Sequence, residues 1–178
     1  GSVTDPEGRE GLAKMSAALL DEGAGELKAA EFQKKLEEIA ARLSFSAGRD
    51  NYNGRLSTLV SEREQAFNLL KLSLNRPRFD ERAVERIRDQ LNAFLIRNVE
   101  VPQRVLGRKW SETVFAGHGY SRPSDGTKAS VASITKADLN TFVSTRFTRD
   151  RLIVGVVGDI SEAELGRRLD QVFGGLPK

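Results

Sequence analysis

The first helical pattern of the sequence reads Gly11-Leu12-Ala13-Lys14-Met15-Ser16-Ala17-Ala18-Leu19-Leu20. Apolar residues recur in it three and four positions apart, which is the spacing of one buried helix face. Gly23 and Gly25 follow and end the pattern. We therefore expect a helix that starts near Arg9, after turn residues at positions 5–8.

A second helix and a β-hairpin are expected next. The helix is predicted over residues 29–42, with an apolar stripe formed by Phe32, Leu36, Ile39 and Ala40. Residues 43–47 alternate between apolar and polar, as a half-buried strand does. Turn residues occupy positions 48–51 and 53–54, and residues 55–60 can return as the partner strand.

The rest of the chain is mainly helical in pattern. Helices are predicted over residues 61–74, 80–98, 102–115 and 135–146, with an exposed loop at 116–127. Thr135 with Asp138, and Ser161 with Glu164, have the spacing of capping boxes. The apolar run Leu152–Val157 predicts a buried strand, and a last helix ends at Gly174-Gly175. The expected fold is α+β, with more helix than strand, in a single domain of residues 1–178.

Composition excludes several classes of protein. The 28 basic and 25 acidic residues give a net charge of +3 that is spread along the chain, whereas nucleic-acid binding normally needs concentrated positive charge. No apolar run approaches the ~20 residues that cross a bilayer, so we expect no membrane insertion. The absence of cysteine excludes disulfides, thiolate metal sites and cysteine nucleophiles.

Few residues could carry catalytic chemistry. His118 is the single histidine, and it lies in a glycine-rich loop without a G-x-S-x-G motif, so a loop-packing role is favoured over a metal ligand or a triad member. Residues 155–159 contain two of the three glycines of a dinucleotide fingerprint and are better explained by a tight turn. A basic stretch interleaved with acidic residues predicts a solvated helix face rather than an anion site; its arginines are Arg76, Arg78, Arg82, Arg86 and Arg88.

Three segments, in this order, resemble the pitrilysin, insulinase and mitochondrial processing peptidase family. Residues 1–13 are similar to the glycine-rich strand exit and helix start before that family's zinc motif. Residues 115–126 are similar to its His-Pro-Tyr-Gly loop, with Gly119 in place of proline. Residues 152–159 and 172–177 are similar to its late strand and its closing Phe-Gly-x-Leu-Pro. The resemblance implies an antiparallel or mixed sheet packed on helices, as in the N-terminal peptidase domain of the pitrilysin type.

The same resemblance implies that the zinc site is lost. The family carries an inverted His-x-x-Glu-His on the helix after Gly-Leu-Ala. Lys14 and Ala18 stand at the two histidine positions and Ala17 at the glutamate base. Phe94 stands where the distant glutamate ligand belongs. We therefore expect no catalytic residue, metal or cofactor in this chain, with zinc present only in a partner subunit.

The resemblance also implies partners and leaves alternatives open. In heterodimeric members a zinc-bearing and a metal-free subunit close around an unfolded peptide, and bacterial members of that kind are often exported to the periplasm. Further domains of the same gene product could take the place of the partner. A structural subunit of a larger complex, like the core proteins of respiratory complexes, is the alternative, and an enzyme with an unconventional site is a third hypothesis. Tyr120 and Arg122 are not assigned the family's carbonyl-binding role, which belongs to a later domain.

The family's domain begins with strands that precede the segment matched by Gly1 and Ser2. A sheet without these strands would expose unpaired backbone groups and apolar surface. We expect the missing strands to come from another chain or from further residues of a longer gene product.

Overall fold

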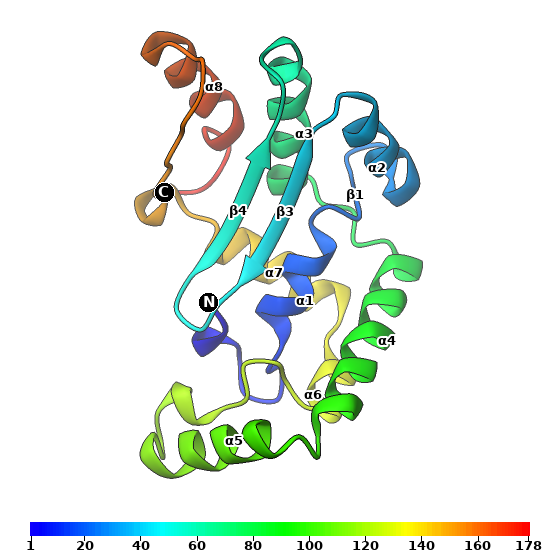
Figure 1. The fold of residues 1–178 in the computed structure, drawn as a ribbon, viewed down its shortest axis with the longest axis vertical. Coiled ribbons are helices and arrows are strands. Elements are labelled where there is room, and N and C mark those ends of the chain that lie inside the picture. Colours follow the sequence, from blue (N-terminus) through cyan, green and yellow to red (C-terminus); the bar gives the residue numbers. More distant parts are fainter.

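The computed structural model describes residues 1–178 and has a short helix, α1 (Leu12–Leu19), at its centre (Figure 1). A 3₁₀ turn (Ser2–Thr4) precedes it. The buried carboxylate of Asp5 accepts hydrogen bonds from the backbone N–H groups of Gly11 and Ala13, at 3.0 and 3.1 Å. These groups have no partner inside the helix, so Asp5 fixes where α1 starts. The predicted first helix is confirmed.

A hairpin of β3 (Arg42–Ala47) and β4 (Tyr52–Ser57) lies along α1 (Figure 1). The strands are antiparallel, with Arg42 opposite Ser57 and Ala47 opposite Tyr52. The turn therefore comprises only residues 48–51, and the predicted turn at 53–54 is wrong because these residues pair with Ser46 and Phe45 in the strand. Gly54 lies against the ring of Phe45, where a Cβ would come within 3.2 Å of the ring carbons.

The second helix ends earlier than its sequence pattern predicts. Strands β1 (Gly23–Ala24) and β2 (Leu27–Lys28) pair before it, and α2 covers Ala29–Glu38. Ala40 has a φ of 49° and is exposed, so its predicted place in the buried stripe is wrong. The reversal at Ala40 is what allows the chain to enter β3 two residues later.

Six further helices complete the fold. They are α3 (Arg63–Asn75), α4 (Glu81–Asn98), α5 (Pro102–Val114), α6 (Lys128–Ser133), α7 (Lys136–Arg146) and α8 (Glu162–Phe173). Four of them were predicted within a few residues and α8 ends before Gly174 as expected, whereas the short α6 was not predicted. No helix has the length and apolarity needed to cross a membrane.

The two predicted capping boxes have different outcomes. Thr135 and Asp138 bond reciprocally at the start of α7, as predicted. At α8, the hydroxyl of Ser161 accepts a bond from the backbone N–H of Glu164, but the carboxylate of Glu164 pairs with Arg63 at 3.3 Å instead of returning to the cap. Because α8 packs on α3, the carboxylate of Glu164 binds Arg63 of α3, and only the bond to the Ser161 hydroxyl forms at this cap.

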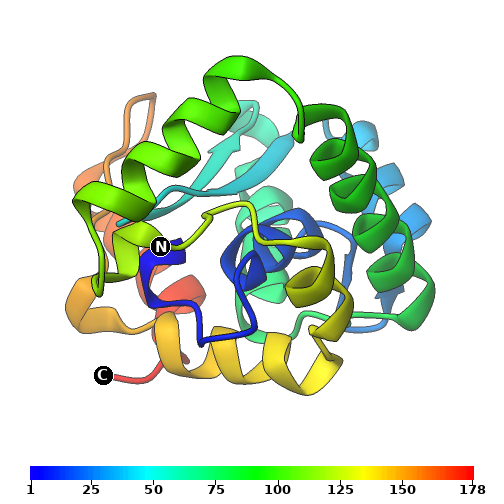
Figure 2. The same cartoon turned by 90° about the horizontal axis from the view of Figure 1, so that it is seen from below.

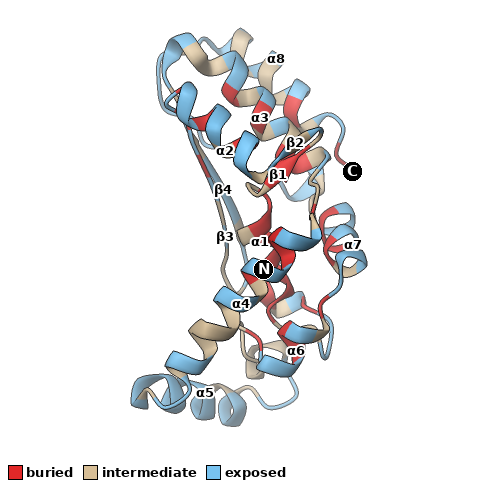
Figure 3. Ribbon diagram, turned by 90° about the vertical axis from the view of Figure 1, so that its right-hand side faces the viewer, coloured by how far each residue is buried: buried red, intermediate tan, exposed pale blue.

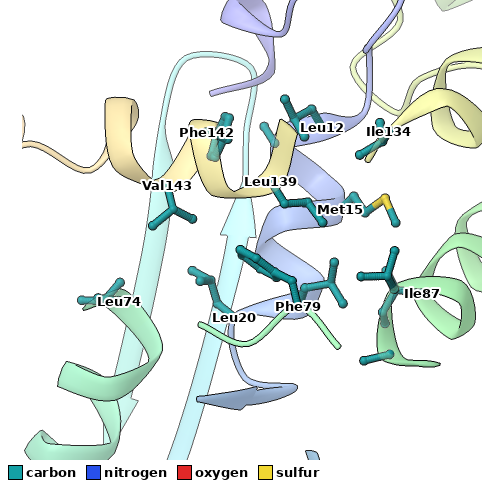
Figure 4. Close-up of a cluster of buried hydrophobic side chains, with 14 of the residues drawn as sticks. Leu12, Met15, Leu20, Leu74, Phe79, Ile87, Ile134, Leu139, Phe142 and Val143 are labelled. Carbon is teal, nitrogen blue, oxygen red and sulfur yellow. The ribbon is translucent and has the colours of Figure 1, made fainter. Parts of the chain in front are cut away.

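The core consists of two apolar clusters. The larger surrounds α1 and includes Met15, Leu20, Phe79 and Leu139, which point toward one another from three segments of the chain (Figure 4). The smaller lies between α2, α3 and β3 and contains Phe32, Leu36 and Leu69. Helices packed against one side of antiparallel strands make this an α+β fold, as predicted.

The predicted buried strand Leu152–Val157 is the largest error. The segment runs past β4 toward α8 without entering a sheet, and Ile153 and Val157 are 95% and 104% exposed (Figure 1). A strand exists only where a neighbour accepts and donates its ladder bonds, and no other segment of this chain does so. The apolar pattern is real, but its burial would need a further strand.

Candidate functional site

Lys14, Ala17 and Ala18, three of the four positions predicted to correspond to the family's zinc motif, lie on one turn of α1. Met15 and Ser16 between them point into the core, while Lys14 and Ala18 are half-buried and Ala17 is 5% exposed. A helix turn holds such positions on neighbouring parts of its surface. Of these three positions on α1, only Lys14 and Ala18 are therefore partly accessible to solvent.

The ammonium of Lys14 forms an ion pair with the carboxylate of Asp125. Asp125 lies in the loop that returns from α5 past the start of α1 (Figure 2). The next residue, Gly126, has a φ of 78°, and a Cβ there would lie 2.3 Å from the carbonyl oxygen of Glu10. This close backbone approach, which only glycine permits, holds Asp125 beside Lys14. Within the predicted exposed loop, Gly126 is therefore buried and Asp125 is half-buried.

Arg104 connects this ion pair to the fourth position. Its Nη1 lies 3.5 Å from Oδ2 of Asp125, and its guanidinium lies over the ring of Phe94, 5.5 Å from the ring centre. Phe94 comes from α4 and Arg104 from α5. Of the predicted residues, Lys14 and Phe94 are thus linked through two residues that were not predicted. We call these four the Lys14 cluster: Lys14, Phe94, Arg104 and Asp125.

The Lys14 cluster brings two positively charged side chains, Lys14 and Arg104, to one carboxylate, Asp125. Burial, and then the charge of Arg104, lower the pKa of Lys14 from its usual value. Asp125 forms ion pairs with both cations. The cluster carries one more positive than negative charge, and its side chains are an ammonium, a guanidinium, a phenyl ring and an engaged carboxylate.

Residues 1–128 match the family model described as insulinase (peptidase family M16). The chain belongs to this family. Over its whole length the chain is 28% identical to a protein of Helicobacter pylori called non-peptidase homolog YmxG, and it covers 41% of that protein. It is 21% identical to a probable mitochondrial-processing peptidase subunit beta of Arabidopsis thaliana, with 97% of this chain and 33% of that protein covered.

The fold agrees with a solved M16 structure. The crystal structure of a peptidase M16 inactive domain from Pseudomonas fluorescens superposes with a TM-score of 0.94 at 26% identity, covering all of this chain and 43% of the other. The predicted pitrilysin-type α+β fold is thereby confirmed. The chain spans about two fifths of the length of such relatives.

Zinc is the metal that an M16 fold implies, and the residues of α1 do not fit it. Zinc binds imidazole, thiolate and carboxylate ligands. Lys14 presents an ammonium, Ala17 and Ala18 present methyl groups, and Phe94 presents a ring covered by Arg104. Elsewhere in the structure no three His, Cys, Asp or Glu side chains gather as a metal site would require.

His118 has a local role in its loop. Its Nδ1 accepts a hydrogen bond from the backbone N–H of Tyr120, and the two rings meet edge to face at 4.8 Å. The hydroxyl of Tyr120 donates to Asp50 of the hairpin turn. Arg122 donates to the carbonyl oxygens of Asp5 and Val3. These contacts fasten the loop to the N-terminal segment and the hairpin.

The basic stretch divides between ion pairs and structural bonds. Arg78 pairs with Asp80, and Arg86 with Glu22. Arg88 differs from the predicted solvated face, because its side chain is only 16% exposed and donates to the carbonyl oxygen of Ile134. The guanidinium groups of Arg78, Arg86 and Arg88 thus make contacts within the chain.

Sequence reasoning missed Asp125 and Arg104. Asp125 is 111 residues from Lys14 and stands in a loop whose glycines indicate only a turn. Arg104 belongs to a helix whose pattern gives no reason to single it out. The one signal available was Gly126, since a glycine beside an acidic residue is a place where backbones can approach closely.

Proposed function

We propose that this chain is part of a catalytically silent M16 protein, which helps to form a peptide-binding chamber with a zinc-bearing partner. The partner is a second subunit or another domain of the same gene product. In this proposal the Lys14 cluster stands where an active member would hold its metal. Two similar proteins are described as a non-peptidase homolog and as an inactive domain, which supports the silent role.

The observation that carries the proposal is the ion pair of Lys14 with Asp125. A hydrolytic zinc ion activates water by lowering its pKa and by stabilising negative charge in the transition state. The ammonium of Lys14 can supply positive charge but has no open coordination position, and the methyl group of Ala17 cannot accept a proton from water. These residues therefore do not supply the chemistry that zinc and the glutamate base provide in an active member.

Partnership is supported by the surfaces that the chain leaves uncovered. The run Leu152–Val157 is apolar and unpaired, and it lies near the open edge of β4 (Figure 1). Such an edge is normally paired or covered in a native protein. We propose that strands from outside residues 1–178 complete this sheet, as the family resemblance implies.

The test compares the chain alone, a zinc-bearing M16 partner alone, and the two together. A quenched, unfolded peptide reports cleavage, and fluorescence anisotropy of an uncleavable version reports binding. We expect no cleavage by the chain alone and tighter peptide binding by the complex than by the partner. Zinc-dependent turnover by the chain alone contradicts the proposal. A stable complex to which the chain adds no peptide affinity indicates the purely structural role instead.

A further inference from the structure

The single histidine of the chain caps a short turn with a nitrogen that must be unprotonated. Nδ1 of His118 accepts a hydrogen bond from the backbone N–H of Tyr120 at 3.1 Å, at the start of the 3₁₀ turn Gly119–Ser121. A neutral imidazole has one acceptor nitrogen, whereas both nitrogens of the charged ring are donors. Because a backbone N–H can only donate, this bond exists only while His118 is neutral.

The turn positions Tyr120, which contacts two neighbouring parts of the fold. Its ring lies edge to face against His118 and against Phe115 at the end of α5, with ring centres 4.8 and 5.3 Å away. Its hydroxyl donates to the carboxylate of Asp50 in the hairpin turn. Its carbonyl oxygen accepts from Arg49, whose guanidinium lies 5.1 Å from the centre of the same ring. A displacement of Tyr120 would therefore disturb both α5 and the hairpin turn.

Charged groups surround the turn on the elements that pack against it. They are Arg49 and Asp50 of the hairpin turn, Arg122 of the loop, Asp5 and the amino group of Gly1 in the N-terminal segment, and the paired Lys109 and Glu112 of α5. A positive charge on His118 would be attracted by Asp50 and repelled by Arg49, since both contact Tyr120. These two effects oppose each other, whereas a protonated Nδ1 has no lone pair left for the Tyr120 N–H.

We propose that His118 is a pH-sensitive switch, which on protonation releases the Tyr120 N–H and loosens residues 115–122 from the hairpin turn. Histidine is the side chain that ordinarily changes charge between pH 5 and 8, so the release occurs as the pH falls through this range. The inference goes beyond the proposed function and does not depend on it, because it rests on the acceptor geometry of His118 and not on the Lys14 cluster.

Two other groups near the turn also change charge in this range. Burial raises the pKa of the Asp5 carboxyl to about 6, and burial lowers the pKa of the Gly1 amino group from its usual value. A pH dependence of the loop would therefore not identify His118 without variants at position 118 itself.

The experiment measures hydrogen exchange of the Tyr120 amide by NMR between pH 8 and pH 5, with each rate divided by the intrinsic rate at that pH. Three full-length chains are compared: the wild type, His118→Asn and His118→Ala. Asparagine at a cap accepts from the backbone without titrating, and alanine offers no acceptor. We expect wild-type protection to fall about two- to tenfold toward pH 5, the factor that one net hydrogen bond represents. His118→Asn should keep its protection, and His118→Ala should lack it at every pH.

The Gly126 amide is the internal control, because it donates to the carbonyl oxygen of Pro123 at 3.0 Å in the same loop without involving His118. Its protection should be the same in the three chains. The proposal is overturned if wild-type protection of Tyr120 is equal at pH 8 and pH 5, or if His118→Ala is protected like the wild type at pH 8. It is also overturned by an equal decline in His118→Asn, which assigns the effect to Asp5 or Gly1, or by a parallel decline at Gly126, which indicates general unfolding.

Discussion

Helices α1 and α5 both carry apolar residues at helical spacing, yet they occupy opposite environments (Figure 3). In α1, Leu12, Met15 and Leu19 are at most 3% exposed and form the centre of the larger core cluster. In α5 no residue is buried, and Leu106, Trp110 and Val114 are 69%, 64% and 50% exposed. Apolar spacing therefore predicts that a helix has a face to bury, but not whether the same chain buries it.

Truncation within α1 should have the largest effect. Met15 is fully buried among residues of several helices, so Met15→Ala removes apolar contacts and leaves a cavity. We expect a loss of about 2–5 kcal/mol in the free energy of unfolding, measured by urea denaturation. A loss below ~1 kcal/mol would mean that α1 is not the centre of the core.

The start of α1 should give stability a pH dependence. Burial raises the pKa of Asp5 from 3.8 to about 6, against the opposing effect of bonds from the backbone N–H groups of Ala13 and Gly11. The folded state then holds this proton more tightly than the unfolded state. The contribution is fully present below pH 4 and is lost as the pH rises to about 6, by at most ~3 kcal/mol.

The measurement is the urea midpoint of the wild type and of Asp5→Asn between pH 4 and pH 7. The variant lacks the titrating group, so other groups contribute equally to both proteins. Wild-type stability should decline relative to the variant across this window. A relative increase with pH would show that the bonds from α1 outweigh burial and that the pKa of Asp5 is lowered.

A buried hydroxyl group on α3 tests whether burying a polar group without a hydrogen-bond partner lowers the stability of the fold. Ser73 is fully buried and its hydroxyl has no hydrogen-bond partner. Ser73→Ala should raise the free energy of unfolding by about 1 kcal/mol, because it removes an unsatisfied group. Ser130→Ala is the matched control: this hydroxyl donates to the backbone carbonyl oxygen of Glu10 at 2.8 Å, and its loss should lower stability by a similar amount. Equal effects of the two changes would contradict this assignment.

Truncation on α5 should have the smallest effect on stability. Leu106 is 69% exposed and contributes little to the folded chain, so Leu106→Ala should change the free energy of unfolding by less than ~0.5 kcal/mol. The same urea titration that measures Met15→Ala provides the comparison. A loss comparable to that of Met15→Ala would show that α5 packs against the protein in solution.

Features set by local sequence could be predicted. The start of α1 follows from turn residues and apolar spacing, and the box at Thr135 follows from the positions of two side chains three residues apart. Features set by distant partners could not. Helix α2 ends at Glu38, and the left-handed backbone of Ala40 turns the chain into β3. Leu152–Val157 is left unpaired because a strand requires a neighbour.

The candidate site shows the same division. Lys14, Ala17, Ala18 and Phe94 could be selected by resemblance to a known motif, because the motif is read along the chain. Asp125 and Arg104 give these positions their charge environment, and both reach Lys14 only through the fold. Long-range ion pairs leave no periodic trace in a single sequence.

The central claim is that the Lys14 cluster stands in place of a metal site. Its most direct test is the zinc content of the purified chain, measured by mass spectrometry after exhaustive dialysis. The comparison is a variant that combines Lys14→His, Ala17→Glu, Ala18→His and Phe94→Glu. We predict no retained zinc in the wild type and about one zinc ion per chain in the variant, which regains the ligands of the inverted motif. Stoichiometric zinc held by the wild-type chain would contradict the account.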